Sequence, residues 1–146
     1  MKPPEWLYQR LARGVPALHR SLWHLTRGRL GWRLGGVEFC LLKTTGRRSN
    51  RPRTTPLVLI RGASHLFLVA SNGGSDHHPD WYLNLVKHPS VTLETREGRV
   101  TRSARTATET ERSLLWGEAE RVYVGYGTYQ QKTKRVIPIV LLDETQ

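Results

Sequence analysis

Six short segments of apolar or alternating residues recur after residue 36, and their length constrains the fold more than any other feature. The segments are residues 37–44, 56–61, 65–71, 90–96, 99–104 and 136–142. Each is long enough for a β-strand and too short for a typical helix. Turn residues such as Glu97-Gly98 separate neighbouring segments, so most strands are expected to pair antiparallel. The pattern predicts a mainly β, α+β fold built on a small six-stranded barrel, in which Pro138 indicates an edge or a bulge in the last strand.

Two helical patterns interrupt these strands. The first begins at Pro79, which suits the first turn of a helix, and ends before Pro89, because the residue before a proline disfavours the α region. The second spans residues 108–122, where Thr108 and Glu111 have the spacing of a capping box. Only two helices are therefore predicted within the barrel domain.

Residues 1–35 are predicted to form a basic amphipathic helical segment, separate from a barrel domain of residues 36–146. Apolar residues recur in this segment every three or four positions, at Leu7, Leu11, Val15, Leu18, Leu22 and Leu25. Arginines occupy the opposite side, and Pro16 predicts a kink. Two compatible interpretations stay open: the leucines pack on the barrel, or residues 5–27 contact an anionic membrane surface.

The chain is strongly basic. It has 23 lysine and arginine residues against 12 aspartate and glutamate residues, a formal net charge of +11, so it attracts polyanions. Cys40 is the single cysteine, which excludes a disulfide framework and fits a reducing compartment. No run of about 18 apolar residues occurs. These features predict a cytoplasmic location, and peripheral contact with the inner face of the plasma membrane stays open.

Five cations fall within the stretch "KTTGRRSNRPR", from Lys43 to Arg53, which we call the cationic turn. Arginine can bind phosphate or carboxylate oxygens with two nitrogen donors at once, and the hydroxyls of this stretch add further donors. The stretch lacks the spacing of a P-loop and precedes no helix, so it is not a triphosphate-binding loop. Two interpretations remain: an anion-binding nest or a solvated cationic turn.

A polar stretch, residues 71–74 (SNGG), follows the apolar run of residues 66–70, and we call it the elbow. Its glycines permit positive φ and let a flat ligand approach the backbone. On the helix that follows, Trp81, Asn84 and Leu85 share one face. An aromatic wall, an amide and free backbone N–H groups are typical of a slot for a planar heterocycle. A strand-to-helix turn with Trp81 in the core is the alternative.

Tyr123, Tyr126 and Tyr129 alternate with Gly125 and Gly127 near the C-terminus. Steps of three residues do not keep side chains on one stripe of an α-helix, and the glycines favour a loop or a loose turn. Three phenols on such a segment are typical of a hydrophobic pocket or lid that also forms hydrogen bonds. Half-buried structural tyrosines are the alternative.

The sequence shows no set of side chains for hydrolytic catalysis. Adjacent histidines in Asp76-His77-His78 project in different directions and no second pair supports them, so no metal site is predicted. No histidine follows Ser71 at a spacing that indicates a nucleophile and its general base. Cys40 lies in an apolar strand, which is typical of an inert core thiol. If the chain is an enzyme, a bound cofactor must supply the chemistry.

Three motifs resemble those of the deazaflavin-dependent nitroreductase and quinone reductase family. These proteins are split β-barrel oxidoreductases with an FMN-binding-like fold that use reduced coenzyme F-420. The motifs are "LLKTTGRRSNRPRTTPL", "VASNGGSDHHPDWYLNL" and "YVGYGTYQQKTKRVIPIVLL", and they occur in this order within residues 34–142. The resemblance implies hydride transfer from reduced coenzyme F-420 to a quinone, a nitro compound or another activated electrophile. This cofactor consists of an 8-hydroxy-5-deazaflavin ring and an oligoglutamate tail.

The resemblance also implies roles for individual residues. It assigns the cofactor's phosphate and tail to Arg47, Arg48, Ser49, Arg53, Thr54 and Thr55. It assigns the ring to Val69, Ala70, Ser71, Asn72, Asp80, Trp81, Tyr82, Leu83, Asn84 and Tyr126. It assigns the substrate to Val58, Tyr123, Tyr126 and Tyr129. Ser71 and Tyr126 are the expected catalytic residues, with Ser71 donating a hydrogen bond to an acceptor oxygen near the hydride-donating carbon.

Three positions depart from the family pattern. Val58 stands where nitroreductase-active members have a tyrosine, Val124 where many members have proline, and Asn72 where some have lysine. These positions concern the substrate pocket more than the cofactor site, which favours a quinone over a nitroaromatic prodrug as acceptor.

Other functions stay open at this stage. One is an FMN-binding oxidoreductase on the same barrel, and another is a cofactor carrier without catalysis. A third is a basic barrel that stacks single-stranded nucleic acid on its aromatic side chains, although the motif set predicts no nucleic-acid partner. The sequence does not predict the oligomeric state.

Overall fold

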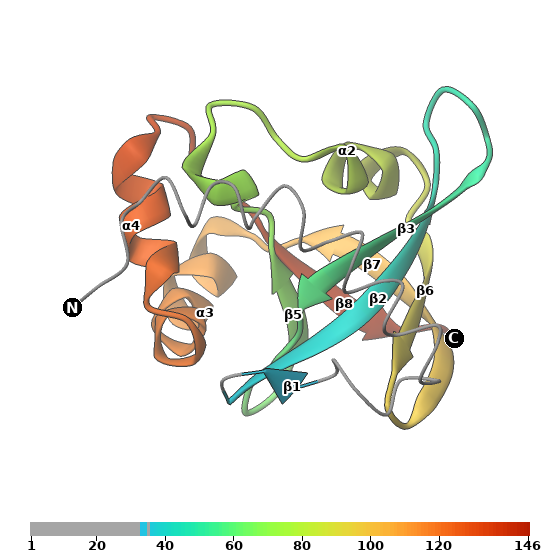
Figure 1. Ribbon diagram of the computed structural model, residues 1–146, viewed down its shortest axis with the longest axis horizontal. Helices are drawn as coiled ribbons and strands as arrows, with labels where there is room; N and C mark the ends of the chain where they lie inside the picture. The colour runs from blue at the N-terminus through green and yellow to red at the C-terminus, as the bar shows by residue number, and fades with distance from the viewer. Residues whose placement is uncertain (1–32, 35) are drawn as a thin grey trace.

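The computed structural model describes residues 33, 34 and 36–146. The strands are β1 (Arg33–Leu34), β2 (Val37–Thr45), β3 (Pro52–Val58), β4 (Ile60–Arg61), β5 (Leu66–Val69), β6 (Ser90–Thr95), β7 (Gly98–Thr106) and β8 (Ile139–Glu144). The helices are the short 3-10 helix η1 (Asn72–Gly74), α2 (Asp80–Lys87), α3 (Glu109–Val122) and α4 (Gly125–Lys132). Figure 1 shows one twisted sheet with α2 on one side of it and α3 and α4 on another. The predicted N-terminal amphipathic helix lies outside the described residues.

Every strand pairing in the described sheet is antiparallel. β2 pairs with β1, β3 and β6, and the sheet continues from β6 through β7, β8 and β5 to β4. The mainly β, α+β prediction is confirmed, whereas the count of six strands is wrong, because the sheet has eight. The short β1 was not predicted, and the predicted strand over residues 56–61 is divided into β3 and β4 at the buried Leu59. Since β3 pairs with β2 and β4 pairs with β5, this bend curls the sheet.

The cationic turn is the tip of a β-hairpin. β3 begins at Pro52 rather than at residue 56, because β2 extends to Thr45 and pairs with β3 along its whole length. Prolines are tolerated in β3 because, among the described strands, β2 is its only ladder partner. The loop that carries the arginines is therefore held at both ends by a regular ladder.

The last strand is central and not at an edge, so the expectation drawn from Pro138 was wrong. β8 lies between β7 and β5. Pro138 comes directly before the strand, where no N–H is needed for the ladder, and its carbonyl accepts a hydrogen bond from the Ala70 N–H at 2.9 Å.

Both predicted helices are confirmed, and a third was missed. α3 begins after Thr108, whose hydroxyl accepts from the Glu111 N–H while the Glu111 carboxylate accepts from the Thr108 N–H, so the capping box is complete. The loop expected around the tyrosines is wrong, because α4 forms there. A Cβ on Gly125 would meet the Tyr123 ring, and a Cβ on Gly127 would lie 3.2 Å from a Glu120 carboxylate oxygen. The glycines therefore allow close packing, and tertiary contact outweighs their low helix propensity.

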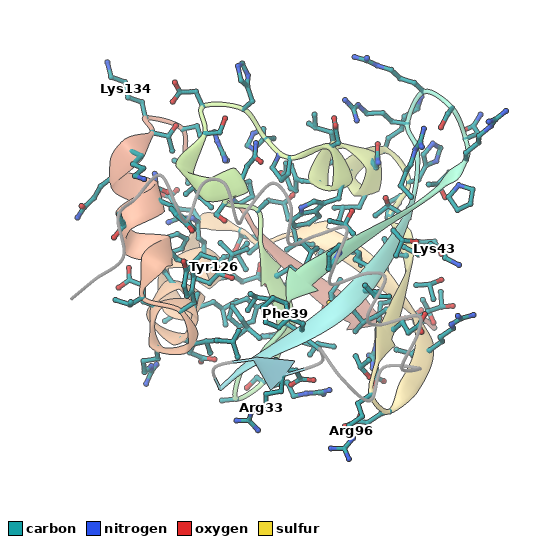
Figure 2. The ribbon with its side chains drawn as sticks, in the orientation of Figure 1. Arg33, Phe39, Lys43, Arg96, Tyr126 and Lys134 are labelled. Carbon is teal, nitrogen blue, oxygen red and sulfur yellow. The ribbon has the colours of Figure 1, made fainter. Side chains whose placement is uncertain are left out.

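Apolar side chains bury both faces of β5 and β8. One cluster includes Leu68 and Val140 together with Trp81 of α2, and the other includes Phe67 and Tyr126 of α4. Figure 2 shows Tyr126 on the side of α4 that faces the sheet. Double-sided burial explains why these strands read as unbroken apolar runs.

Two further sequence-based inferences concern the core and the membrane. Cys40 is fully buried, and this burial raises the pKa of its thiol, which agrees with an inert core residue. In the part of the chain that the structure describes, none of the helices combines the length and apolar character needed to cross a bilayer.

Candidate functional site

An open groove of about 770 Å³ lies between the cationic turn and α2. Its lining contains the predicted residues Arg47, Arg48, Ser49, Arg53, Thr54, Thr55, Asp80, Trp81 and Asn84, and also Gly46 and Pro52. In Figure 1 the β2–β3 hairpin rises beside α2. Two segments that are separate in the sequence, and that were assigned to the same cofactor, thus line a single groove.

Arg47 joins the two walls of this groove. Its backbone N–H and its Nη1 both donate to Asn84 Oδ1, at 3.1 and 3.0 Å, and its Nη2 lies 3.0 Å from Asp80 Oδ1. Lys87 Nζ donates to the Arg47 carbonyl at 2.9 Å. The buried Asn84 also contacts the Thr44 hydroxyl, so α2 is fixed on the hairpin. The guanidinium donors of Arg47 are therefore engaged in hydrogen bonds with Asn84 and Asp80. The positive charge of Arg47 also neutralises Asp80, the one carboxylate in the groove lining.

Arg48 and Arg53 are the cations that the groove leaves available. Among the described residues, neither side chain forms a hydrogen bond or an ion pair, and both residues are exposed. With Arg47 and Asp80 paired to each other, these two guanidinium groups give the lining a net positive charge. Hydroxyls of Ser49, Thr54 and Thr55 lie in the same lining. This donor set suits phosphate and carboxylate oxygens.

The elbow is a tight turn with left-handed backbone. Asn72, Gly73 and Gly74 have φ values of 46°, 64° and 82°. Asn72 donates its side-chain amide to the His77 carbonyl at 2.9 Å, so this amide stabilises its own loop. Ser71 is half-buried, and its hydroxyl has no hydrogen-bond partner within residues 36–146. A hydroxyl without a protein partner is free to bind a ligand.

Val69 and Ala70, which precede the elbow, lie in the core. Ala70 is fully buried, and both of its backbone groups are hydrogen-bonded within the protein, the N–H to Pro138 and the carbonyl to the Arg135 guanidinium. Val69 packs in the same cluster as Tyr126. These two residues therefore support the elbow from below.

Arg135 was not predicted, and it makes more contacts with the elbow region than any other described side chain. Its Nε donates to the Ser75 carbonyl at 2.7 Å, and its Nη2 donates to the Ser71 carbonyl at 2.8 Å. Its Nη1 lies 3.1 Å from His78 Nδ1. Burial lowers the pKa of the guanidinium, which nevertheless stays charged at neutral pH. Its place three residues before Pro138 carried no recognisable signal, because its partners lie more than 55 residues away.

The three tyrosines meet in one cluster. Tyr123 directly follows α3, whereas Tyr126 and Tyr129 lie on α4. The three rings would point in different directions on one continuous helix, and they meet because the chain changes direction between α3 and α4. The Tyr123 and Tyr126 centroids are 5.1 Å apart with perpendicular planes, and the Tyr123 and Tyr129 hydroxyls are 3.0 Å apart. Val58 of β3 packs against the same core cluster. The structure thus brings the three tyrosines together and places Val58 against the same core cluster.

The phenols of Tyr123 and Tyr126 stay protonated at neutral pH. Burial, helped by the hydrogen bond with Tyr129, raises the pKa of Tyr123 to about 12. Burial also raises the pKa of Tyr126, which is only 4 % exposed. The cluster can therefore offer hydrogen-bond donors and apolar ring faces, but not a general base.

Tyr82 and Leu83 do not line the groove. The Tyr82 hydroxyl forms a hydrogen bond of 2.9 Å with the Thr106 hydroxyl, which directs the ring towards β7. Leu83 is half-buried on α2.

The Asp76 carboxylate accepts a hydrogen bond from the Thr133 hydroxyl at 2.7 Å. No group of three metal-binding side chains occurs among the described residues.

The comparisons with known proteins agree on one family. A family model described as F420H(2)-dependent quinone reductase matches residues 17–144. An F420H(2)-dependent quinone reductase of Mycobacterium tuberculosis is 34% identical over 145 residues, which cover 94% of this chain and 95% of that protein. A protein of the same name from a second strain gives the same values.

Solved structures agree with the sequence comparisons. The structure of an F420-H2-dependent reductase is similar with a TM-score of 0.66 and 34% identity, covering 72% of this chain and 93% of that one. A second structure, described as a domain-swapped dimer, has a TM-score of 0.68 and 30% identity, covering 85% and 96%. The family model spans residues 17–144, a range that includes the groove, the elbow and the tyrosine cluster.

Proposed function

The chain belongs to the F420H(2)-dependent quinone reductase family, and on this premise we propose that it transfers a hydride from reduced coenzyme F-420 to a quinone. The observation that carries the proposal is the groove with two unpaired arginines, Arg48 and Arg53, which continues along α2 to Trp81. The proposed cofactor is a long polyanion with a flat ring. A cationic groove whose lining includes an aromatic residue, Trp81, fits both parts of such a molecule.

The donor chemistry of the groove fits the cofactor. Arg48 and Arg53 would bind the phosphate and the glutamate carboxylates, with help from the hydroxyls of Ser49, Thr54 and Thr55. Arg47 would hold the hairpin in place, because its donors are engaged with Asp80 and Asn84. Trp81 would stand at the ring end of the groove.

The bound reduced deazaflavin supplies the hydride, and the quinone becomes a hydroquinone by taking up this hydride and one proton from water. The protein needs no carboxylate base for this reaction. It must orient the acceptor, exclude water and offer a donor to the oxygen on which negative charge develops. Ser71 has a free hydroxyl for this donation, and the tyrosine cluster has the ring faces to hold an aromatic acceptor.

We infer that quinones are better acceptors than nitroaromatic compounds. Val58, which packs with the tyrosine cluster, has no hydroxyl to donate to a nitro group. The pocket wall at this position is apolar, which suits a quinone with a hydrocarbon substituent.

Two measurements test the proposed function. Fluorescence titration of the full chain with coenzyme F-420 and with FMN should give tighter binding of F-420. Oxidation of reduced F-420 should then be faster with a quinone such as menadione than with a matched nitroaromatic. Tighter binding of FMN would favour a flavin enzyme, and binding of F-420 without oxidation by any acceptor would favour a carrier.

We also propose that residues 1–35 act as a basic segment distinct from the cofactor-binding domain of residues 36–146, and that the protein is cytoplasmic with peripheral membrane contact through residues 5–27. Only the sequence pattern supports these statements, since residues 1–32 and 35 lie outside the described part of the chain, and the described Arg33 and Leu34 pair with β2 as β1. Flotation with anionic vesicles should recover the wild-type chain, and replacing Leu11, Leu18 and Leu22 with serine should abolish this recovery.

A further inference from the structure

Arg135 belongs to the segment that connects α4 to β8. The hydrogen-bond partners of its guanidinium all lie in the loop that contains the elbow. The hydrogen bonds run to the carbonyls of Ala70, Ser71 and Ser75, and the remaining contact is with His78 Nδ1. Burial and the neighbouring guanidinium lower the pKa of His78, so its ring is neutral and can accept a hydrogen bond. One side chain thus holds four residues of the loop.

The β-ladder stops where these contacts begin. The last pair between β5 and β8 is Val69–Ile139, so the carbonyls of Ala70 and Ser71 lie beyond the regular pairing. A partly buried carbonyl without a donor destabilises the fold, because it loses its hydrogen bond to water without replacement. The planar guanidinium of Arg135 donates to both carbonyls.

Two other contacts join the same surfaces. The Thr133 hydroxyl donates to Asp76 Oδ1 at 2.7 Å. Gly74 lies so close to α4 that a Cβ there would be 2.8 Å from the Tyr129 carbonyl oxygen. The loop is therefore docked on the end of α4, which carries Tyr126 and Tyr129.

We propose that Arg135 is a positioning residue for hydride transfer, because it sets the separation between Ser71 and the tyrosines of α4, the two sides of the space in which the acceptor would react. This inference rests on the proposed function. Arg135 does not belong to the groove lining, so it acts through the elbow and α4 and not on the charged end of the cofactor. Small displacements of reacting groups cost large factors in rate.

Arg112 provides the matched control. It is also a partly buried arginine that supports the same end of α4, donating to the Ile137 carbonyl at 2.8 Å and to Gln130 Oε1 at 2.9 Å. Its guanidinium stacks on the Trp116 ring and does not contact the elbow. Arg112→Ala therefore removes the hydrogen bonds of another partly buried arginine beside α4 without releasing the loop.

The experiment compares the wild type with Arg135→Ala, Arg135→Lys and Arg112→Ala. Active sites are counted by titration with F-420, and the oxidation of reduced F-420 is followed with menadione. We expect kcat to fall at least tenfold in Arg135→Ala while the Kd for F-420 changes less than threefold. The kcat of Arg135→Lys should lie between those of the wild type and Arg135→Ala, because an ammonium group restores the charge but cannot form all the hydrogen bonds of the guanidinium. Arg112→Ala should keep kcat per active site near the wild-type value.

The outcomes separate this inference from the function on which it rests. A wild type that binds no F-420, or does not oxidise it with a quinone, overturns the proposed function and this inference with it. A working wild type for which Arg135→Ala and Arg112→Ala lose kcat equally, or for which Arg135→Ala changes only Kd, overturns the inference alone. If Arg135→Ala does not fold, a wild-type kcat in Arg135→Lys also overturns it.

Discussion

The groove and the tyrosine cluster, the two regions of the proposed site, have opposite physical character. The groove is open and polar, and its cations Arg48 and Arg53 are exposed to solvent. The tyrosine cluster is part of the core, and its central ring, Tyr126, is 4 % exposed. The groove is built mainly from one hairpin and one helix, whereas the cluster joins α3, α4 and β3 and is backed by the elbow.

This difference teaches how the two regions should respond to change. Exposed charges act at a distance, are screened by salt and contribute modestly one by one. Close-packed contacts act over fractions of an ångström and tolerate little displacement. Substitutions in the groove should therefore weaken binding gradually, whereas substitutions at the elbow should disrupt folding and turnover together.

The largest effect is expected for Gly74→Ala compared with Gly73→Ala. Both glycines have left-handed φ, but a Cβ on Gly74 would meet the Tyr129 backbone, whereas Gly73 has open space. We expect Gly74→Ala to lower the free energy of unfolding by about 3 kcal/mol, from backbone strain and overpacking together. Gly73→Ala should lower it by about 1 kcal/mol, from strain alone. Urea denaturation measures both values, and equal losses would show that the elbow is not tightly docked on α4.

An intermediate effect is expected for the double variant Arg48→Ala with Arg53→Ala. Two exposed contacts to an anion contribute together about 1.4 kcal/mol, so the Kd for F-420 should rise about tenfold at low salt. Titration at increasing ionic strength should bring the variant and the wild type together, because salt screens the lost attraction.

The control for the groove removes the same charge elsewhere. Arg51→Ala with Lys134→Ala lowers the net charge equally, and neither side chain belongs to the groove lining. This control should bind F-420 nearly as well as the wild type. A loss of affinity equal to that of the groove variant would mean that overall charge, and not the groove, attracts the cofactor.

The smallest effect is expected at the start of α3, the helix that precedes Tyr123, because this end of the helix lines neither the groove nor the tyrosine cluster. The Arg105 guanidinium and the Thr108 N–H lower the pKa of Glu111 from 4.5 to about 2. A carboxyl group whose pKa is lower in the folded state stabilises the fold when the pH is above its pKa in the unfolded chain. This contribution is lost as the pH falls from about 4.5 towards 2. Glu111→Gln should therefore be less stable than the wild type at neutral pH, and the difference should shrink over that window. A constant difference in thermal melting across this pH range would contradict the assignment.

Local patterns in the sequence predicted most of the strands, two helices and the chemistry of the groove. The alternation around Glu97-Gly98 predicted the hairpin of β6 and β7 correctly, and Thr108 marked the start of α3. The clustered cations marked the cationic lining of the groove, because adjacent residues of one turn remain neighbours after folding. Hydrogen bonding and periodicity over a few residues are encoded in the order of the residues themselves.

The errors occurred where distant segments meet. The glycines around Tyr126 predicted a loop, but close packing on α3 makes that segment helical. Pro138 indicated an edge, but the strand after it is enclosed by β5 and β7. That Arg47 binds the cofactor stays a prediction, and its hydrogen bonds within the protein, to Asp80 and Asn84 across the groove, were not foreseen.

The sequence by itself thus determined the strand content, the basic groove and the polar elbow, because each depends on neighbours within one turn or one ladder. Only the tertiary structure decided that three tyrosines from two helices form one wall, and that Arg135 holds the elbow across 64 residues of chain. The physical reason is that a buried carbonyl or a glycine takes whichever partner the fold brings within contact distance, and nothing adjacent in the chain records which partner that is.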